Sequence, residues 1–216
     1  MSRAWRCSKE RRRTEMSHRI EILDKSVVYD GFFKMIRYRL RHGLFQGGLS
    51  APLTRELFER GHSVGVLPYD ADRDEVLLIE QFRIGALDHP RGAWLMEIVA
   101  GIVEPGERPT DVARREAVEE ADCRLQAIEP ICEYLVSPGG TSESVALYCA
   151  RMDSEGLDGG IHGHDHEGED IKVHVVPFEE AMDMVETGII HSAMPIIALQ
   201  WLALHRDRLR EAWQSY

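Results

Sequence analysis

The chain has 216 residues, of which 44% are hydrophobic and 29% charged, a composition typical of a soluble protein with one sizeable core. Its 26 Lys and Arg against 37 Asp and Glu give a formal net charge of −11. This charge argues against nucleic acid as a partner, because that binding depends on neutralising phosphates. No apolar run approaches the roughly 18 to 20 residues of a membrane-spanning helix, so no membrane partner is expected.

The cysteines and the first residues indicate the cellular compartment. No C-x-x-C spacing is present, and the N-terminus lacks the apolar segment of a secretory signal. Reduced thiols in the cytoplasm therefore fit best. The four cysteines are Cys7, Cys123, Cys132 and Cys149.

Residues 1–15 are polar, with arginines at 11–13, and Met16 could itself begin a shorter chain. One interpretation is a basic arm for nucleic acid or anionic lipid. The segment also carries Glu10 and Glu15 and lacks an apolar helical face. We therefore expect a disordered, solvated tail.

Several segments show patterns typical of strands. Between residues 33 and 41, apolar residues alternate with arginines, which is the period of a half-buried strand. Short runs rich in apolar and β-branched residues predict further strands. These candidates are 26–30, 63–70, 75–82, 131–136, 144–150 and 171–176.

Helices are predicted at 110–121, at 178–187 and from Ser192 to about residue 211, with Ser192 as a cap and Pro195 in the first turn. This order of elements predicts an α/β fold in which helices cover both faces of a mixed sheet. Residues 151–170 contain glycines and acids without apolar periodicity, so they are expected to form a long loop between two strands.

Three carboxylates share one face of the predicted central helix, because Glu116, Glu119 and Glu120 stand at i, i+3 and i+4. Such a cluster can simply be a solvated acidic face. The like charges repel each other unless a cation offsets them, and Mg²⁺ prefers oxygen ligands of this kind. The pattern around the helix favours the magnesium site.

The segment GIVEPGERPTDVARREAVEEADC, which begins at Gly101, resembles the Nudix hydrolase motif G-x5-E-x7-R-E-U-x-E-E-x-G-U, where U is apolar. The matching positions are Gly101, Glu107, Arg115, Glu116, Ala117, Glu119, Glu120 and Cys123. The departure is Asp122, where the family has Gly at the helix end. Asp tolerates a left-handed conformation there at a cost of order 1 kcal/mol.

The resemblance implies a Nudix α/β/α sandwich and a site for Mg²⁺, with Mn²⁺ as an alternative ion. Its ligands would be Glu116, Glu120, the backbone carbonyl of Ala100 and a shared Glu119. Glu107 and Arg115 would brace the loop and the helix.

In this family a carboxylate from a loop corresponding to 151–170 acts as general base on metal-bound water. By position Glu167 is the candidate, Glu169 would complete a metal shell, and Asp170 is the alternative for either role. A zinc site or a histidine base is a weaker interpretation of the same loop. Its histidines are His162, His164 and His166.

Pro138, in the segment SPGGTSE, stands sixteen positions after Asp122, as in the ADP-ribose pyrophosphatase group. By itself Pro-Gly-Gly is only a tight turn. The wider similarity spans about residues 19–204 and implies that Arg83 contacts the phosphates and Glu143 the terminal ribose. Phe32 and Arg55 would sandwich adenine, one from each subunit of a homodimer with exchanged N-terminal strands.

The expected function is hydrolysis of ADP-ribose to AMP and ribose 5-phosphate. The expected organisation is a tail at 1–15, dimer-forming N-terminal strands at 16–56 and a Nudix domain at 57–216. One alternative is a Nudix hydrolase of another nucleotide sugar, such as ADP-glucose or GDP-mannose. Another is a non-catalytic Nudix domain that senses ADP-ribose, against which the intact carboxylates count.

Overall fold

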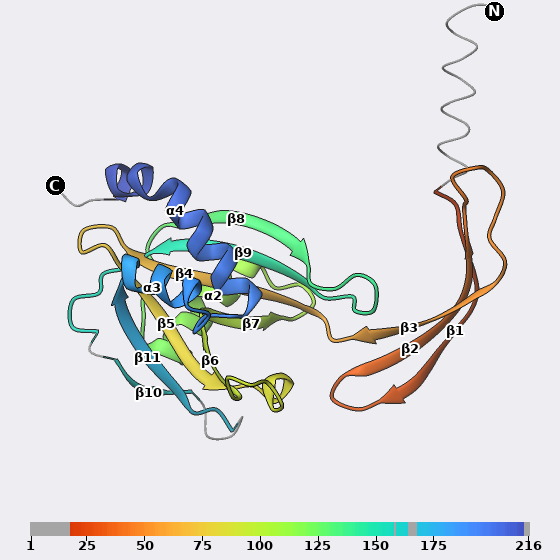
Figure 1. Cartoon of the computed structure of the whole chain (residues 1–216), viewed down its shortest axis with the longest axis horizontal. Coiled ribbons are helices and arrows are strands. Elements are labelled where there is room, and N and C mark those ends of the chain that lie inside the picture. Colours follow the sequence, from red (N-terminus) through yellow and green to blue (C-terminus); the bar gives the residue numbers. More distant parts are fainter. Residues whose placement is uncertain (1–17, 158, 164–167, 214–216) are drawn as a thin grey trace, which may run out of the picture. The chain divides into compact units, whose positions relative to one another are not determined.

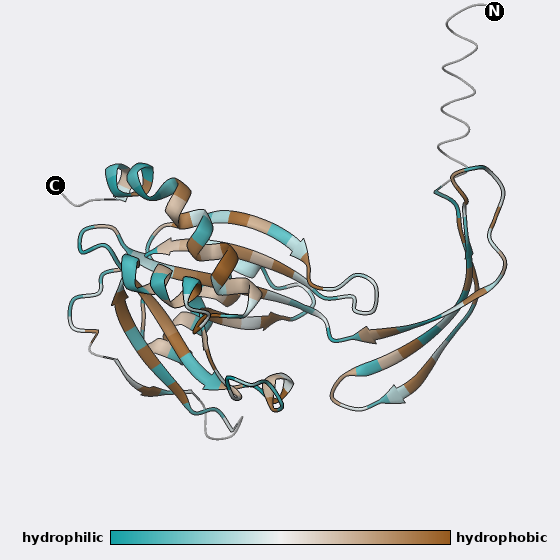
Figure 2. Ribbon diagram, in the orientation of Figure 1, coloured by the Kyte–Doolittle hydropathy of each residue, from teal (hydrophilic) through white to brown (hydrophobic). Residues whose placement is uncertain are grey.

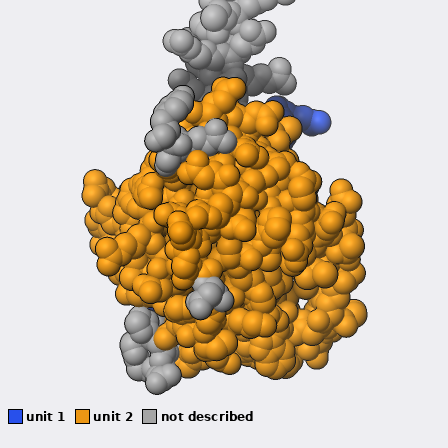
Figure 3. All heavy atoms as spheres, turned by 90° about the vertical axis from the view of Figure 1, so that its left-hand side faces the viewer, with its two compact units in different colours: residues 1–60, 135–143 blue, residues 61–134, 144–216 orange. Residues whose placement is uncertain are grey.

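A computed structural model describes residues 18–157, 159–163 and 168–213. The chain divides into two compact units, coloured separately in Figure 3. The first contains the described residues up to Arg60 together with Leu135–Glu143, and the second contains Gly61–Tyr134 and Ser144–Tyr216. The predicted tail at 1–15 lies outside the described residues.

The first unit contains a three-stranded antiparallel sheet in the order β1-β2-β3 (Figure 1). Its strands are β1 (Ile20–Asp30), β2 (Lys34–His42) and β3 (Leu53–Glu59). β1 begins before the predicted 26–30, and β3 was not predicted, because its sequence LTRELFE lacks a clean alternation. Pairing with β2 holds β3 extended, so tertiary contacts decide its conformation.

The second unit is built on a mixed sheet, as predicted, and its strand order is β10-β11-β5-β4-β9-β8. β4 pairs in parallel with β9, whereas its pairing with β5 and that of β5 with β11 are antiparallel. β6 pairs with β5, and β7 pairs with β4. The strands are β4 (His62–Asp70), β5 (Glu75–Phe82), β6 (Trp94–Glu97), β7 (Val99–Val103), β8 (Ile128–Leu135), β9 (Ser144–Arg151), β10 (Gly160–His162) and β11 (Ile171–Pro177).

Helices cover both faces of this sheet, as predicted. Val64 and Val66 of β4 belong to a core that includes helix α2 (Pro109–Ala121). The alternate residues Leu67 and Tyr69 pack with α3 (Phe178–Glu186) and α4 (Ala193–Trp213). Figure 2 shows β5 apolar along most of its length and hydrophilic toward its end. The central strands are therefore buried on two sides, and β5 carries the polar residues Glu80 and Gln81 just before its last residue, Phe82.

Some predicted details were wrong. The segment 151–170 is not all loop, because β10 lies within it and pairs with β11. β6 and β7 were missed, since WLMEIVAGIV is apolar without alternation. Ser192 lies directly before α4, but its Oγ has no hydrogen-bond partner among the described residues, so the predicted side-chain cap does not form.

A short 3₁₀ helix, η1 (Ile84–Ala86), follows β5. Within the part of the chain that the structure describes, none of the helices combines the length and apolar character needed to cross a bilayer.

Candidate active site

The turn between β7 and α2 is fixed by Glu107. The backbone N–H of Glu104 donates to Glu107 Oε2 at 3.0 Å, and the N–H of Glu107 donates to the carbonyl of Glu104 at 3.0 Å. Pro109 is the first residue of α2, where a backbone N–H would have no partner within the helix, so its absence does not destabilise α2. This contact is the kind of bracing that the resemblance implies for Glu107, and it sets the start of α2 relative to β7.

Glu116 lies directly over the backbone of Gly101. A Cβ on Gly101 would stand 2.3 Å from Glu116 Oε1 and 2.5 Å from its Cγ, closer than real Cβ contacts come. Only glycine therefore lets the Glu116 side chain approach β7 in this way. The first glycine of the motif makes room for one of the expected metal ligands.

Glu120 is the most buried of the three carboxylates, with 3% of its surface exposed. The N–H of Ala100 donates to Glu120 Oε2 at 3.1 Å, which joins the end of α2 to β7. Burial is the main reason that the pKa of Glu120 is raised to about 8, and the charges of Glu116 and Glu169 raise it further. The Ala100 N–H and the charge of Arg83 oppose this shift.

Arg115 links the carboxylates along the helix. Its Nη1 lies 3.0 Å from Glu116 Oε1 and 3.2 Å from Glu119 Oε2. Partial burial alone would lower the pKa of Arg115, but the charges of Glu116, Glu119 and Glu107 raise it above its usual value. The cation therefore offsets part of the repulsion among the acids of the motif.

Asp122 ends α2 in the left-handed conformation, with φ 46° and ψ 30°, as expected for this position. The N–H of Asp122 donates to the carbonyl of Val118 at 3.0 Å, which is the five-to-one bond of an αL cap, and the N–H of Cys123 donates to the carbonyl of Ala117 at 2.9 Å. Asp122 thus adopts the left-handed conformation at the position where the family motif has glycine.

Arg83 lies just beyond β5 and pairs with Glu97 of β6, with 2.7 Å between Arg83 Nε and Glu97 Oε2. Its charge also acts on Glu120, so it belongs to the same electrostatic site. Sequence reasoning gave Glu97 no role. Glu97 is a lone acid in the apolar segment WLMEIVAG, which could have marked it as a candidate. Its pairing with Arg83 could not be predicted without the register of β5 and β6.

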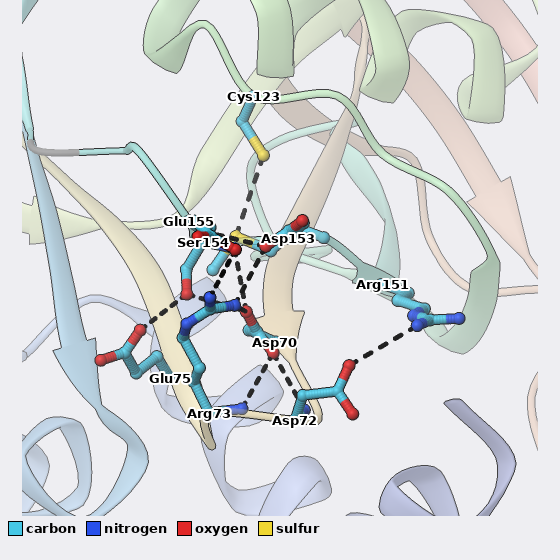
Figure 4. A network of polar contacts seen from close by, with 10 residues as sticks. Asp70, Asp72, Arg73, Glu75, Cys123, Arg151, Asp153, Ser154 and Glu155 are labelled. Carbon is cyan, nitrogen blue, oxygen red and sulfur yellow. Dashed lines mark hydrogen bonds and ion pairs between the residues drawn. The ribbon is translucent and has the colours of Figure 1, made fainter. Parts of the chain in front are cut away.

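The stem of the segment 151–170 is anchored by Asp70 at the end of β4 (Figure 4). Asp70 is 2% exposed, and both the N–H and the Oγ of Ser154 donate to its Oδ2, at 2.9 and 2.8 Å. Arg73 bridges Asp70 to Asp153 and Glu155. This network, absent from the sequence prediction, fixes the chain where it leaves β9 toward the predicted catalytic loop.

Only part of that loop is described. Glu169 is close enough to Glu120 for its charge to raise the pKa of that carboxyl group, and its role as a metal ligand stays a prediction. Glu167, the candidate base, lies outside the described residues, as do His164 and His166. The zinc interpretation of the loop histidines therefore remains a prediction.

Three predicted substrate residues belong to the first unit. Glu143 is 4% exposed, and its Oε2 lies 3.3 Å from Arg60 Nη1. Phe32 is 87% exposed and packs edge-on against Phe33, with ring centroids 4.7 Å apart. Arg55 donates to the carbonyl of Thr54 at 2.8 Å. Their roles in binding remain predictions.

The acids of α2 suit a divalent cation. Among the described residues, no three His, Cys, Asp or Glu side chains converge closely enough to hold a metal on their own. The buried carboxyl of Glu120 nevertheless lies beside the charge of Glu116, an arrangement that a hard cation would stabilise. The carboxylate oxygens of α2 are donors of the kind that hard divalent cations prefer.

Comparison with known proteins agrees with this geometry. Residues 59–198 match the family model described as the NUDIX domain. The chain is 48% identical over 194 residues to the ADP-ribose pyrophosphatase of Escherichia coli (strain K12), covering 90% of this chain and 92% of that protein. The ADP-ribose pyrophosphatase of Haemophilus influenzae is 43% identical, covering 90% of this chain and 91% of that protein.

More distant relatives share the same core. The GDP-mannose pyrophosphatase of Cronobacter sakazakii is 33% identical, with coverage of 88% of this chain and 97% of that protein. A crystal structure described as an ADP compounds hydrolase superposes with a TM-score of 0.68 at 20% identity, covering 92% of this chain and 98% of that chain, which shows the shared fold. The sequence motif, the sandwich fold and these matches agree, and the chain belongs to the Nudix family.

Proposed function

We propose that this protein is a Mg²⁺-dependent ADP-ribose pyrophosphatase, with Mn²⁺ as a substitute ion. Water adds to one phosphorus of the diphosphate, the bridging P–O bond breaks, and AMP and ribose 5-phosphate leave. The observation that carries the proposal is the Glu120 carboxyl, buried beside Glu116 and hydrogen-bonded to Ala100, at the end of a Nudix helix. The identity to the E. coli ADP-ribose pyrophosphatase supports the choice of substrate.

The proposed cation is held by acidic side chains of α2 and by one backbone oxygen. The ligands would be Glu116, Glu119, Glu120, Glu169 and the carbonyl of Ala100. When bound, the metal neutralises the diphosphate and lowers the pKa of a water. Arg115 and Glu107 keep these side chains in place through the contacts described above.

Other side chains bind the substrate and move protons. Glu167 accepts a proton from the attacking water, with Asp170 as the alternative. Arg83 presents a guanidinium fork to the phosphates, and Glu143 accepts hydrogen bonds from the terminal ribose. Phe32 and Arg55 hold the adenine by stacking and cation–π attraction.

We further propose a cytoplasmic homodimer with exchanged N-terminal strands. Its support is the first unit, where β1 leaves large apolar side chains exposed, a surface that a second copy would cover. These side chains include Ile20, Ile22, Val27 and Tyr29.

A second candidate substrate is GDP-mannose, because relatives of that name are 33% identical over most of the chain. The test is a panel of ADP-ribose, ADP-glucose and GDP-mannose, assayed with Mg²⁺. The highest kcat/KM is expected for ADP-ribose. A preference for GDP-mannose would overturn the substrate assignment, and tight binding without turnover would indicate a sensor instead.

Hydrolysis in isotopically labelled water identifies the attacked phosphorus, and Glu167→Gln tests the base. We expect Glu167→Gln to retain Mg²⁺ affinity but to slow turnover by about 10²- to 10⁴-fold. An undiminished rate would transfer the role to Glu169, Asp170 or a histidine.

A further inference from the structure

Gln81 carries a buried amide without a hydrogen-bond partner. The residue is 5% exposed, and its Nε2 has no acceptor among the described residues. It lies in the polar end of β5, two residues before Arg83. Nearly all buried polar groups in proteins are paired, so a partnerless donor beside a functional arginine needs an explanation.

The register of β5 and β6 places Gln81 on the same face of the sheet as Glu97, the partner of Arg83. Ile79 pairs with Glu97, and Gln81 pairs with Leu95. Directly opposed residues and residues two apart share one face of a sheet, so Gln81 and Glu97 are diagonal neighbours. Ile79 packs in the core that contains α2, so this is also the face of the carboxylates.

The side chain of Arg83 contacts Glu97 from a position further along the chain than Gln81. Arg83 stands two residues beyond Gln81, whereas Glu97 stands opposite the residue two positions before it. The direct neighbour of Gln81, Leu95, has no side-chain acceptor. In the free protein Glu97, the diagonal neighbour of Gln81, is therefore paired with Arg83, while Gln81 Nε2 has no acceptor among the described residues.

We propose that Gln81 is a positioning residue that takes over the Glu97 carboxylate when Arg83 turns to the diphosphate of the substrate. The inference rests on the proposed function, because it requires Arg83 to bind phosphate. The Glu97 side chain is only 17% exposed, so losing its cation would leave a poorly solvated charge. The Gln81 N–H then donates to Glu97 and lowers the cost of releasing Arg83.

An alternative is that Gln81 contributes only to core packing and has no role in binding. Its substitution would then change the stability of the free protein and leave ligand affinity unchanged. The proposed donor behaves in the opposite way, because its hydrogen bond forms only in the complex. Stability and affinity, measured on the same variant, separate these roles.

The decisive variant is Gln81→Leu, which keeps the volume and removes the donor. The probe is the non-hydrolysable α,β-methylene analogue of ADP-ribose with Mg²⁺, and its affinity is measured by calorimetry on the full chain. We expect about 10- to 150-fold weaker binding, which corresponds to one lost hydrogen bond to a charged group. Thermal unfolding of the free variant should occur at the wild-type temperature or above it. Unchanged affinity would overturn the inference.

Two further variants complete the test. In a Glu97→Gln background, Gln81→Leu should weaken analogue binding much less, since the charge on which it acts is gone. An equal effect in both backgrounds would contradict a role through Glu97. Arg83→Ala tests the underlying assignment: if it leaves affinity unchanged, the phosphate role of Arg83 is wrong. If Arg83→Ala weakens binding and Gln81→Leu does not, only the present inference is wrong.

Discussion

The backbone of Gly101 lies against the side chain of Glu116, so that an added Cβ would stand 2.4 Å from the Glu116 carboxyl carbon. We expect Gly101→Ala to push Glu116 away from β7, because its Cγ and carboxyl group would both collide with the new methyl group. A displacement of this size at a metal ligand should lower kcat/KM for ADP-ribose by about 10- to 100-fold. Steady-state kinetics and a Mg²⁺ titration measure both effects.

Gly85→Ala is the matched control for Gly101→Ala. An added Cβ at Gly85 meets nothing within 4 Å, and its φ does not lie in the left-handed region. The control should retain wild-type kinetics and Mg²⁺ dependence. If Gly101→Ala shows the same kinetics as this control, the close approach of Glu116 to β7 is unimportant for activity.

Glu120→Gln removes a carboxyl group that can ionise to bind a cation and keeps the shape of the side chain. The free protein should remain as stable as the wild type, since an uncharged amide is no harder to bury than a carboxyl group. Mg²⁺ binding should be lost, and turnover should fall by at least about 10²-fold. Calorimetric titration with Mg²⁺ and thermal unfolding test these expectations. Wild-type Mg²⁺ affinity in the variant would exclude Glu120 as a ligand.

The local chemistry of α2 could be predicted from sequence, because neighbours on one helix are set by spacing. Glu116, Glu119 and Glu120 share a face for that reason, and Asp122 adopts the left-handed conformation expected at a helix end. The contact between Gly101 and Glu116 is different. The two residues are far apart in sequence, and only the packing of α2 on β7 brings them together.

The pairing of Arg83 with Glu97 and the position of Gln81 were out of reach for a similar reason. They depend on the register between β5 and β6, and β6 shows no alternation by which it could be recognised. The Asp70 network joins a β-turn to a residue more than eighty positions later, Ser154. Sequence patterns predict periodic elements better than such long-range polar contacts.

Asp122→Gly restores the family's residue at the end of α2. Because Asp122 has φ 46°, a side chain there carries strain that glycine lacks. We expect a gain of about 0.5 to 1 kcal/mol in the free energy of unfolding, with kcat and KM unchanged. Urea denaturation and kinetics provide the measurement. Lower stability would show that the Asp side chain makes a compensating contact.

Asp70 should make the protein sensitive to acid. Burial alone would raise its pKa, but hydrogen bonds from Ser154, Arg73 and Asp72 lower the pKa below its usual value. A carboxyl group with a lowered pKa in the folded state stabilises the protein above its unfolded pKa, near 3.9. This stabilisation is lost as the pH falls through the lower, folded pKa.

Asp70→Asn should therefore reduce the free energy of unfolding at pH 7 by about 1 to 3 kcal/mol, because the amide nitrogen cannot accept the N–H bonds. The difference from wild type should shrink as the pH falls below about 4, where the Asp70 carboxyl group of the unfolded wild-type chain binds a proton while that of the folded protein is still charged. The exposed Asp72→Asn is the control, with an expected change within about 0.5 kcal/mol. Urea denaturation between pH 7 and 3 tests this, and a difference that stays constant with pH would show that the charge of Asp70 contributes nothing.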